Sequence, residues 1–193
     1  MDKLILKTIL ITWLAILLAC IVTFTCLSLF FPMTLSNMFF NMGANNLSVT
    51  FAERAYEKDK NINNLSILID RSIFSDDYTV LDKYGAIFVG HNDFAEFCEK
   101  QDAGKPQGAE FSYRGYIYGS VSIAKYEKQG IVEALSFAKG SRPPEIDGKV
   151  CYSFLGGRVI ENGDKPAAAA LKERLESFNN LDYSWLITEL GKI

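Results

Sequence analysis

Residues 8–31 read TILITWLAILLACIVTFTCLSLFF, and this stretch carries no charged side chain. At about 1.5 Å of rise per residue, a helix of this length reaches about 36 Å, which exceeds the roughly 30 Å of hydrocarbon in a bilayer. A core helix of a soluble protein keeps a polar face, and this stretch has none. It therefore predicts a transmembrane helix over 8–31.

Two processed forms of this stretch remain as alternatives. A cleaved signal peptide has an apolar core of roughly 7–15 residues and a small-residue cleavage site, whereas this run is longer and ends at Phe31-Pro32. Residues 17–20 (LLAC) loosely resemble a lipoprotein processing site, but the chain stays apolar after Cys20. We expect an uncleaved membrane anchor.

The charges beside the anchor predict its orientation. Lys3 and Lys7 precede it, and the next charged residues after Lys7 are Glu53 and Arg54. Because positive charge near a span stays in the cytoplasm, residues 1–7 are expected inside and the chain after the span outside. The prediction is a single-pass protein whose bilayer contact is residues 8–31 and whose carboxyl-terminal domain is extracytoplasmic.

The remaining residues, 32–193, are numerous enough for one domain with its own core. Without Asp2, Lys3 and Lys7, the chain has 18 Lys and Arg against 22 Asp and Glu. This mildly acidic balance lacks the basic footprint of a nucleic-acid-binding protein. No nucleic-acid partner is expected.

The four cysteines form no metal or redox motif. Cys20 and Cys26 lie in the apolar run, while Cys98 and Cys151 are far apart in the chain, without neighbouring Cys or His at ligand spacing. Two interpretations remain for the second pair: a disulfide on the outer side of a membrane, or two buried free thiols. No metal and no other cofactor is expected.

Apolar residues recur at helical spacing through the rest of the chain, interrupted by Gly, Asn, Asp and Pro. Successive helices paired as hairpins predict an all-α fold, with a loop at 103–108 and a break at 141–144; a strand remains an alternative for the aromatic residues 111–122. The predicted helices cover 32–42, 47–57, 64–74, 78–89, 93–99, 111–130, 131–138, 150–161, 166–178 and 183–190.

The hairpin turns recur with a regular period. Gly43 and Asp76 are separated by the same interval as Gly130 and Gly163. That interval is close to the period of tetratricopeptide repeats, which is about 34 residues. The interval from Asp76 to Gly130 is longer and interrupts the array.

The residues beside two of these turns carry the same resemblance. Residues 152–159 (YSFLGGRV), followed by Ala168, resemble the aromatic, Leu-Gly and large-residue pattern of a tetratricopeptide first helix and the Ala of its second. Residues 35–39 (LSNMF), with Ser48 and Ala55, resemble a first repeat. The resemblance implies a stack of antiparallel helical hairpins after the anchor.

Small residues are expected where the two helices of a hairpin approach each other most closely. We predict such contacts between Ser36 and Ser48 and between Gly156 and Ala168. One hairpin cannot bury both of its faces, so neighbouring hairpins must stack.

The sequence shows no catalytic constellation. His91 is the only histidine, and no nucleophile elbow or phosphate-binding loop accompanies it. We therefore expect a binding protein and not an enzyme.

Helical repeats present a concave surface, and the resemblance implies that first-helix side chains line it. A protein or peptide partner, and a scaffold role, are the leading expectation. The alternatives are an accessory subunit of a larger membrane complex without a groove ligand, a processed lipoprotein, and an enzyme whose site is not recognisable. The predicted groove residues are Ser120, Ala124, Glu127, Val150, Ser153 and Gly157.

Overall fold

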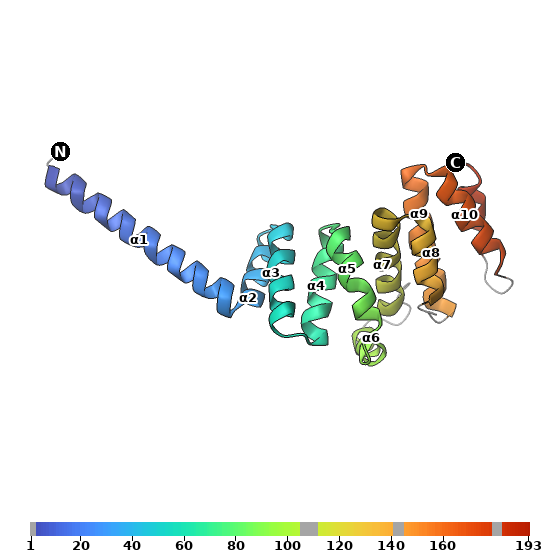
Figure 1. Cartoon of the computed structure of the whole chain (residues 1–193), viewed down its shortest axis with the longest axis horizontal. Coiled ribbons are helices and arrows are strands. Elements are labelled where there is room, and N and C mark those ends of the chain that lie inside the picture. The colour runs from blue at the N-terminus through green and yellow to red at the C-terminus, as the bar shows by residue number, and fades with distance from the viewer. Residues whose placement is uncertain (1–2, 105–111, 141–144, 179–182) are drawn as a thin grey trace. The chain divides into compact units, whose positions relative to one another are not determined.

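The computed structural model describes residues 3–104, 112–140, 145–178 and 183–193 (Figure 1). Every regular element in these ranges is an α-helix, which confirms the predicted all-α fold class. The helices are α1 (Lys3–Phe30), α2 (Pro32–Asn41), α3 (Asn45–Lys58), α4 (Ile62–Phe74), α5 (Tyr78–Val89), α6 (Phe94–Asp102), α7 (Tyr113–Gln129), α8 (Ile131–Gly140), α9 (Glu145–Asn162), α10 (Lys165–Glu176) and α11 (Ser184–Leu190).

The chain divides into two compact units, Met1–Arg71 and Ser72–Ile193. The border falls inside α4, so the helices after the apolar stretch are shared between the two units. The alternative of a strand at 111–122 is wrong for the residues described there, because α7 begins at Tyr113. Most of the predicted loop 103–108, from residue 105 on, and the predicted break at 141–144 lie outside the described residues.

Helix boundaries follow from capping chemistry. Pro32 occupies the first turn of α2, where its missing N–H costs nothing. The side chains of Asp77, Ser112 and Asp164 accept hydrogen bonds from backbone N–H groups three residues later, at the starts of α5, α7 and α10. The turn after α2 contains Gly43 at φ +74°, a conformation that favours glycine.

Helix α1 includes residues Lys7–Phe30, a stretch long and apolar enough to cross a membrane and without buried residues. A signal sequence would share these properties. The hydroxyls of Thr12 and Thr25 donate hydrogen bonds to the carbonyl oxygens four residues earlier, at 3.0 and 2.8 Å. These polar groups are therefore satisfied within the helix, as hydrocarbon surroundings require.

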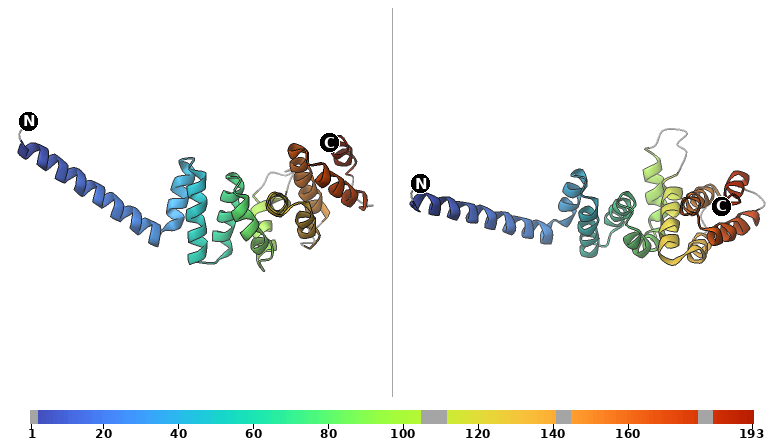
Figure 2. Two further views of the ribbon diagram at one scale, coloured as in Figure 1. Left: turned by 45° about the horizontal axis from the view of Figure 1, so that its top comes forward. Right: turned by 90° about the horizontal axis from the view of Figure 1, so that it is seen from above.

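In the first unit, α2 and α3 form an antiparallel hairpin (Figure 2). The structure brings Ser36 and Ser48 together: each hydroxyl donates to the other residue's carbonyl oxygen at 2.9 Å, and both side chains are buried. The Phe39 and Phe51 rings stack beside them, with centroids 5.5 Å apart. The small Ser36 and Ser48 side chains thus allow α2 and α3 to approach closely, and the paired hydroxyls and stacked rings stabilise this contact.

In the second unit, three glycines lie against a side chain of the next odd-numbered helix, which occupies the space that a Cβ atom would need. A Cβ atom on Gly85 of α5 would lie 2.5 Å from Val121 of α7, and one on Gly119 of α7 would lie 2.6 Å from Phe154 of α9. These distances are shorter than carbon atoms tolerate. We call these contacts, together with a third at Gly156, the glycine sockets.

The third socket involves a neighbour that the sequence did not indicate. The atoms closest to a Cβ on Gly156 of α9 belong to Leu186 of α11, at 2.6 Å. Ala168 is buried on α10, and α9 packs against both α10 and α11. A glycine has no side chain from which the sequence could tell these two neighbours apart, and the predicted contact with Ala168 stays a prediction.

The two cysteines of the second unit, Cys98 and Cys151, are buried and do not form a disulfide. The Cys151 sulfur lies 3.0 Å from the Ser122 hydroxyl of α7, and burial raises the pKa of the thiol to about 11 despite this hydrogen bond. Cys98 lies on α6. Of the two interpretations of this pair, the structure agrees with two buried thiols and not with a disulfide.

Candidate binding cleft

A cleft of about 420 Å³ opens over α7 and α9, beside the turn before α5. Its walls combine apolar surface with charged groups. Most of the lining comes from the amino-terminal end of α5 and the exposed side of α9. The lining residues are Asp76, Tyr78, Ile123, Ser153, Phe154, Gly157, Arg158 and Glu161.

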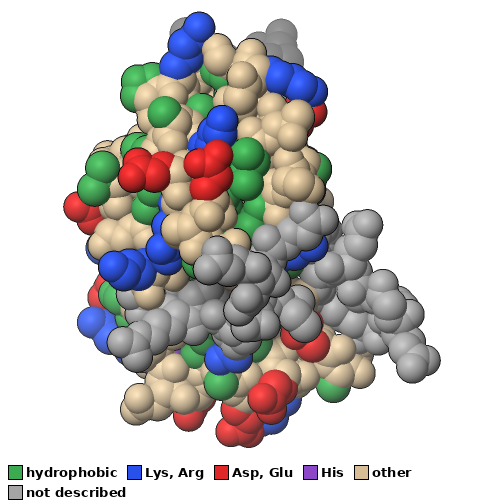
Figure 3. Space-filling model, turned by 90° about the vertical axis from the view of Figure 1, so that its right-hand side faces the viewer, with side chains coloured by type: hydrophobic (Ala, Val, Ile, Leu, Met, Phe, Trp, Pro, Cys, Tyr) green, Lys and Arg blue, Asp and Glu red, His purple; other side chains and the backbone are tan. Residues whose placement is uncertain are grey.

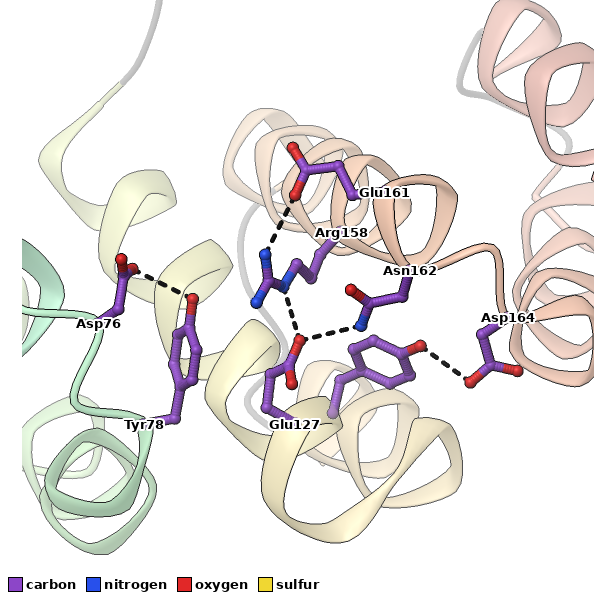
Figure 4. Close-up of polar contacts among 8 residues, drawn as sticks. Asp76, Tyr78, Glu127, Arg158, Glu161, Asn162 and Asp164 are labelled. Atoms are coloured by element: carbon purple, nitrogen blue, oxygen red, sulfur yellow. Dashed lines mark hydrogen bonds and ion pairs between the residues drawn. The ribbon is translucent and has the colours of Figure 1, made fainter.

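Arg158 is the centre of the polar contacts at this cleft (Figure 4). Its Nε donates to Glu127 Oε1 at 2.6 Å, and its Nη1 donates to Glu161 Oε2 at 3.2 Å. The guanidinium carbon also lies 5.5 Å from the ring centroid of Tyr78. The arginine therefore connects α5, α7 and α9 at the cleft.

The partners of Arg158 are themselves held in place. Asn162 Nδ2 donates to the same Glu127 oxygen at 3.0 Å, and the Tyr78 hydroxyl donates to Asp76 Oδ1 at 3.1 Å. Next to Glu127 on α7, the Tyr126 hydroxyl donates to Asp164 Oδ2 at 2.9 Å (Figure 4). Glu127 and Tyr126 of α7 are thus bonded to Asn162 and Asp164 beyond their own helix, and Tyr78 of α5 is bonded to the turn before it. These contacts hold the walls of the cleft in place.

These contacts shift the pKa values of the charged groups. Burial alone would raise the pKa of Glu127, but hydrogen bonds from Arg158 and Asn162 outweigh it and hold the pKa below its ordinary value. The hydrogen bond to Glu127 raises the pKa of Arg158. Burial, followed by the bond to Asp76, raises the pKa of Tyr78. At neutral pH the Glu127–Arg158 pair is therefore charged, and the tyrosine is neutral.

The cleft lining has two carboxylates, on Asp76 and Glu161, and one guanidinium. Both carboxylate residues are exposed, while Arg158 is already engaged by Glu127. On the described part of the face in Figure 3, Lys and Arg side chains are mixed with Asp and Glu. The cleft has a local excess of acid beside the Tyr78 and Phe154 rings.

The structure places three of the six predicted groove residues at this cleft. Ser153 and Gly157 line it, and Glu127 lies behind it in the ion pair with Arg158. The Ser153 hydroxyl donates to the Lys149 carbonyl oxygen at 2.8 Å. A Cβ on Gly157 would meet no atom within 4 Å, so this position is open space.

The other three residues contradict the prediction of a groove face. Ser120, Ala124 and Val150 are 6%, 0% and 7% exposed. Helix α7 packs against α5, α6, α8 and α9, so it buries most of its circumference. A helix in that position offers no continuous free face from which a groove could be lined.

Sequence reasoning missed the residues that give the cleft its chemistry, above all Arg158 and Tyr78. One signal was available for the arginine: it is the only cation between Lys149 and Lys165, and Glu161 follows it at a spacing that places both on one side of a helix. The aromatic ring of Tyr78 comes from a helix much earlier in the chain. Local sequence contains no signal for that approach.

No family model matches this chain, and neither the curated proteins nor the solved structures contain a significant match.

Proposed function

We propose that this protein is a membrane-anchored helical module that binds a segment of another protein in the cleft over α7 and α9. The observation that carries the proposal is the composition of that cleft, where aromatic and apolar walls stand beside two exposed carboxylates. Such a lining suits an extended segment with an apolar side chain and a nearby Lys or Arg. The proposed role is therefore that of a scaffold and not of an enzyme.

The proposal includes the tetratricopeptide-like arrangement of the hairpins. Gly85, Gly119 and Gly156 each receive a side chain from a following helix. Their spacing along the chain is close to the period of that family, which is about 34 residues. This recurrence supports a repeated packing unit, and stacked units of this kind expose a concave surface.

The proposal also includes an uncleaved anchor, with residues 1–7 in the cytoplasm and the helices after Pro32 outside. A Glu173→Cys chain tests the side, because Glu173 is exposed on α10. We expect an impermeant thiol reagent to label it on intact cells, while labelling only after lysis would reverse the orientation. The mass of the purified mature chain separates an uncleaved anchor from both processed forms.

Binding is tested by photo-crosslinking with the full chain in its own membrane. A photoreactive phenylalanine analogue replaces Gly157, where the structure has open space, and in a matched chain it replaces Glu173. We expect a discrete crosslinked product from position 157 and none from position 173. Equal products from both positions, or no product from position 157, would contradict a ligand in the cleft.

Removal of the exposed charges supplies a second test of the cleft. In the Asp76→Asn/Glu161→Gln chain, the product from position 157 should weaken or disappear while the far-ultraviolet circular dichroism stays unchanged. The amide oxygens can still accept the hydrogen bonds from Tyr78 and Arg158, and asparagine tolerates the positive φ of residue 76. An accessory subunit without a groove ligand would behave differently. It would keep its complex in this variant and lose it when an unrelated span replaces α1.

A further inference from the structure

The carboxyl end of α1 packs against α3. Arg54 Nη1 donates to Ser28 Oγ at 2.8 Å, and Lys58 Nζ donates to the Phe30 carbonyl oxygen at 3.0 Å. The Phe24 and Phe51 rings meet edge to face, with centroids 6.1 Å apart. The α2–α3 hairpin is thus attached to the last two turns of the apolar helix.

The length of α1 places this attachment at the membrane. A helix that ran only from Lys7 to Thr23 would be about 25 Å long, which is shorter than the roughly 30 Å of hydrocarbon. A span that ended before Phe24 would therefore be at the lower limit of length. Because the apolar run continues to Phe31, we place the turns of α1 that contact α3 partly within the hydrocarbon, with the hairpin beside them.

The α2–α3 hairpin has the composition that such a depth requires. Residues 8–52 contain no Asp, Glu, Lys, Arg or His, so all of α2 and the first half of α3 are uncharged. Exposed apolar side chains cluster around the turn between the helices, with Met38 at 41%, Met42 at 71% and Leu47 at 47%. Charge begins at Glu53 and Arg54, at the level of Ser28 on α1.

An apolar groove lies between α1 and α2. It is lined from α1 by Ala19, Cys20, Thr23, Phe24 and Leu27 and from α2 by Leu35 and Met38. The lining extends from Leu27 back to Ala19 on α1, and α2 leaves the end of α1 at an open angle (Figures 1 and 2). The contacts of Phe51, Arg54 and Lys58 with Phe24, Ser28 and Phe30 show that α3 runs toward the carboxyl end of α1. The turn of the hairpin is therefore deeper along α1 than Arg54 and Lys58 are.

Backbone groups near the turn are satisfied inside the hairpin, while the side-chain amides of Asn41, Asn45 and Asn46 require a polar environment beside the turn. The N–H groups of Gly43 and Ala44 donate to the Phe40 and Phe39 carbonyl oxygens at 2.9 and 2.8 Å, and the Thr50 hydroxyl donates to the Asn46 carbonyl oxygen at 3.0 Å. Internal satisfaction is the condition for placing a backbone in lipid.

We propose that the α2–α3 hairpin is re-entrant: its turn, residues 41–47, inserts just below the phosphates of the leaflet that α1 leaves, and lipid acyl chains fill the α1–α2 groove. At that level the asparagine amides of the turn still reach lipid headgroups and water. Arg54 and Lys58 then lie at the level of the lipid phosphates, where long cationic side chains are favoured. This inference rests on α1 spanning the membrane.

Tryptophan depth measurements with the full chain test the proposal. Vesicles contain phosphatidylglycerol and phosphatidylcholine brominated on its acyl chains. Three single-tryptophan chains are compared: Trp185→Phe, which keeps Trp13 of α1, and two in a Trp13→Phe/Trp185→Phe background that carry Met42→Trp or Asp59→Trp. All four positions are exposed, so these changes leave the packing intact.

We expect acyl-chain bromine to quench the Met42→Trp chain strongly and to shift its emission to the blue, as it does for Trp13. The Asp59→Trp chain should instead be quenched by aqueous iodide. Quenching of Trp13 by bromine together with iodide quenching of the Met42→Trp chain would overturn the re-entrant hairpin and leave the anchor standing. Iodide quenching of Trp13 would overturn the anchor itself and this inference with it.

Discussion

Filling the Gly85 socket with a methyl group should lower the free energy of unfolding. In a Gly85→Ala chain the new methyl group would lie 2.5 and 2.9 Å from the two methyl groups of Val121 and 3.2 Å from its Cβ, where ordinary contacts begin at 3.4 Å. Rotation about χ1 of a β-branched residue only exchanges its substituents. Since Val121 is fully buried in a close-packed interior, α5 and α7 must separate by roughly 1 Å.

Overpacking of this kind costs about 1–3 kcal/mol. In a helix interior, alanine is also more favourable than glycine by about 0.8–1.0 kcal/mol of helix propensity. The matched control is Gly157→Ala, which receives the same helix gain on α9 but meets no atom within 4 Å. The difference between the two variants is therefore the overpacking cost alone, about 1–3 kcal/mol.

The assay is thermal unfolding of the full chain in detergent micelles, followed by far-ultraviolet circular dichroism. Both substitutions lie in the unit Ser72–Ile193, and for a domain of this size about 1 kcal/mol moves Tm by roughly 4 °C. Gly157→Ala should raise Tm, and Gly85→Ala should lie several degrees below it. Equal Tm values would refute the socket. Adding Val121→Ala to the Gly85→Ala chain should lower the free energy of unfolding by less than Val121→Ala does in the unchanged chain.

Three further predictions concern other contacts. Ser36→Ala should cost about 1–3 kcal/mol because it leaves a buried acceptor in α3 with fewer donors, and the Ser36→Ala/Ser48→Ala pair should cost less than the sum of the single changes in chemical denaturation. Because the pKa of Glu127 is lowered in the fold, its ionised form stabilises the protein above the ordinary glutamate value of 4.5, and this contribution is lost as the pH falls from 4.5 through the lower folded value. Glu127→Gln should therefore make the acid limb of a stability–pH curve shallower. An unchanged acid limb would contradict the ion pair. Cys151, with its pKa raised to about 11, should react with a soluble thiol reagent at mildly alkaline pH only after the chain is denatured, whereas rapid reaction of the native chain would show that the thiol is accessible.

Much of the fold could be predicted because helix boundaries depend on local chemistry. The Asp77 cap and Pro32 mark helix starts in the sequence, and Gly43 marks a turn. The Ser36–Ser48 contact could also be predicted, because both residues lie one to two turns from the same short connection. In an antiparallel hairpin, positions equally far from the turn must meet.

The groove could not be predicted in the same way, because it depends on how many helices surround α7. Residues 117–124 are almost uniformly small or apolar, which indicates burial on several sides and not one exposed face. The analogy with a repeat whose first helix has a free face therefore misplaces Ser120 and Ala124, which are buried. The cleft chemistry of Arg158 and Tyr78 requires a contact between residues far apart in sequence.

The glycine sockets also bear on the order in which the domain can form during synthesis. Val121, Phe154 and Leu186 each follow their glycine in the chain, so each receiving surface leaves the ribosome before the side chain that fills it. Every odd-numbered helix from α7 to α11 can then dock onto one that is already made, and none has to wait for a partner at the far end of the chain. The domain can therefore grow by addition at its carboxyl end, one helix docking as soon as it is made.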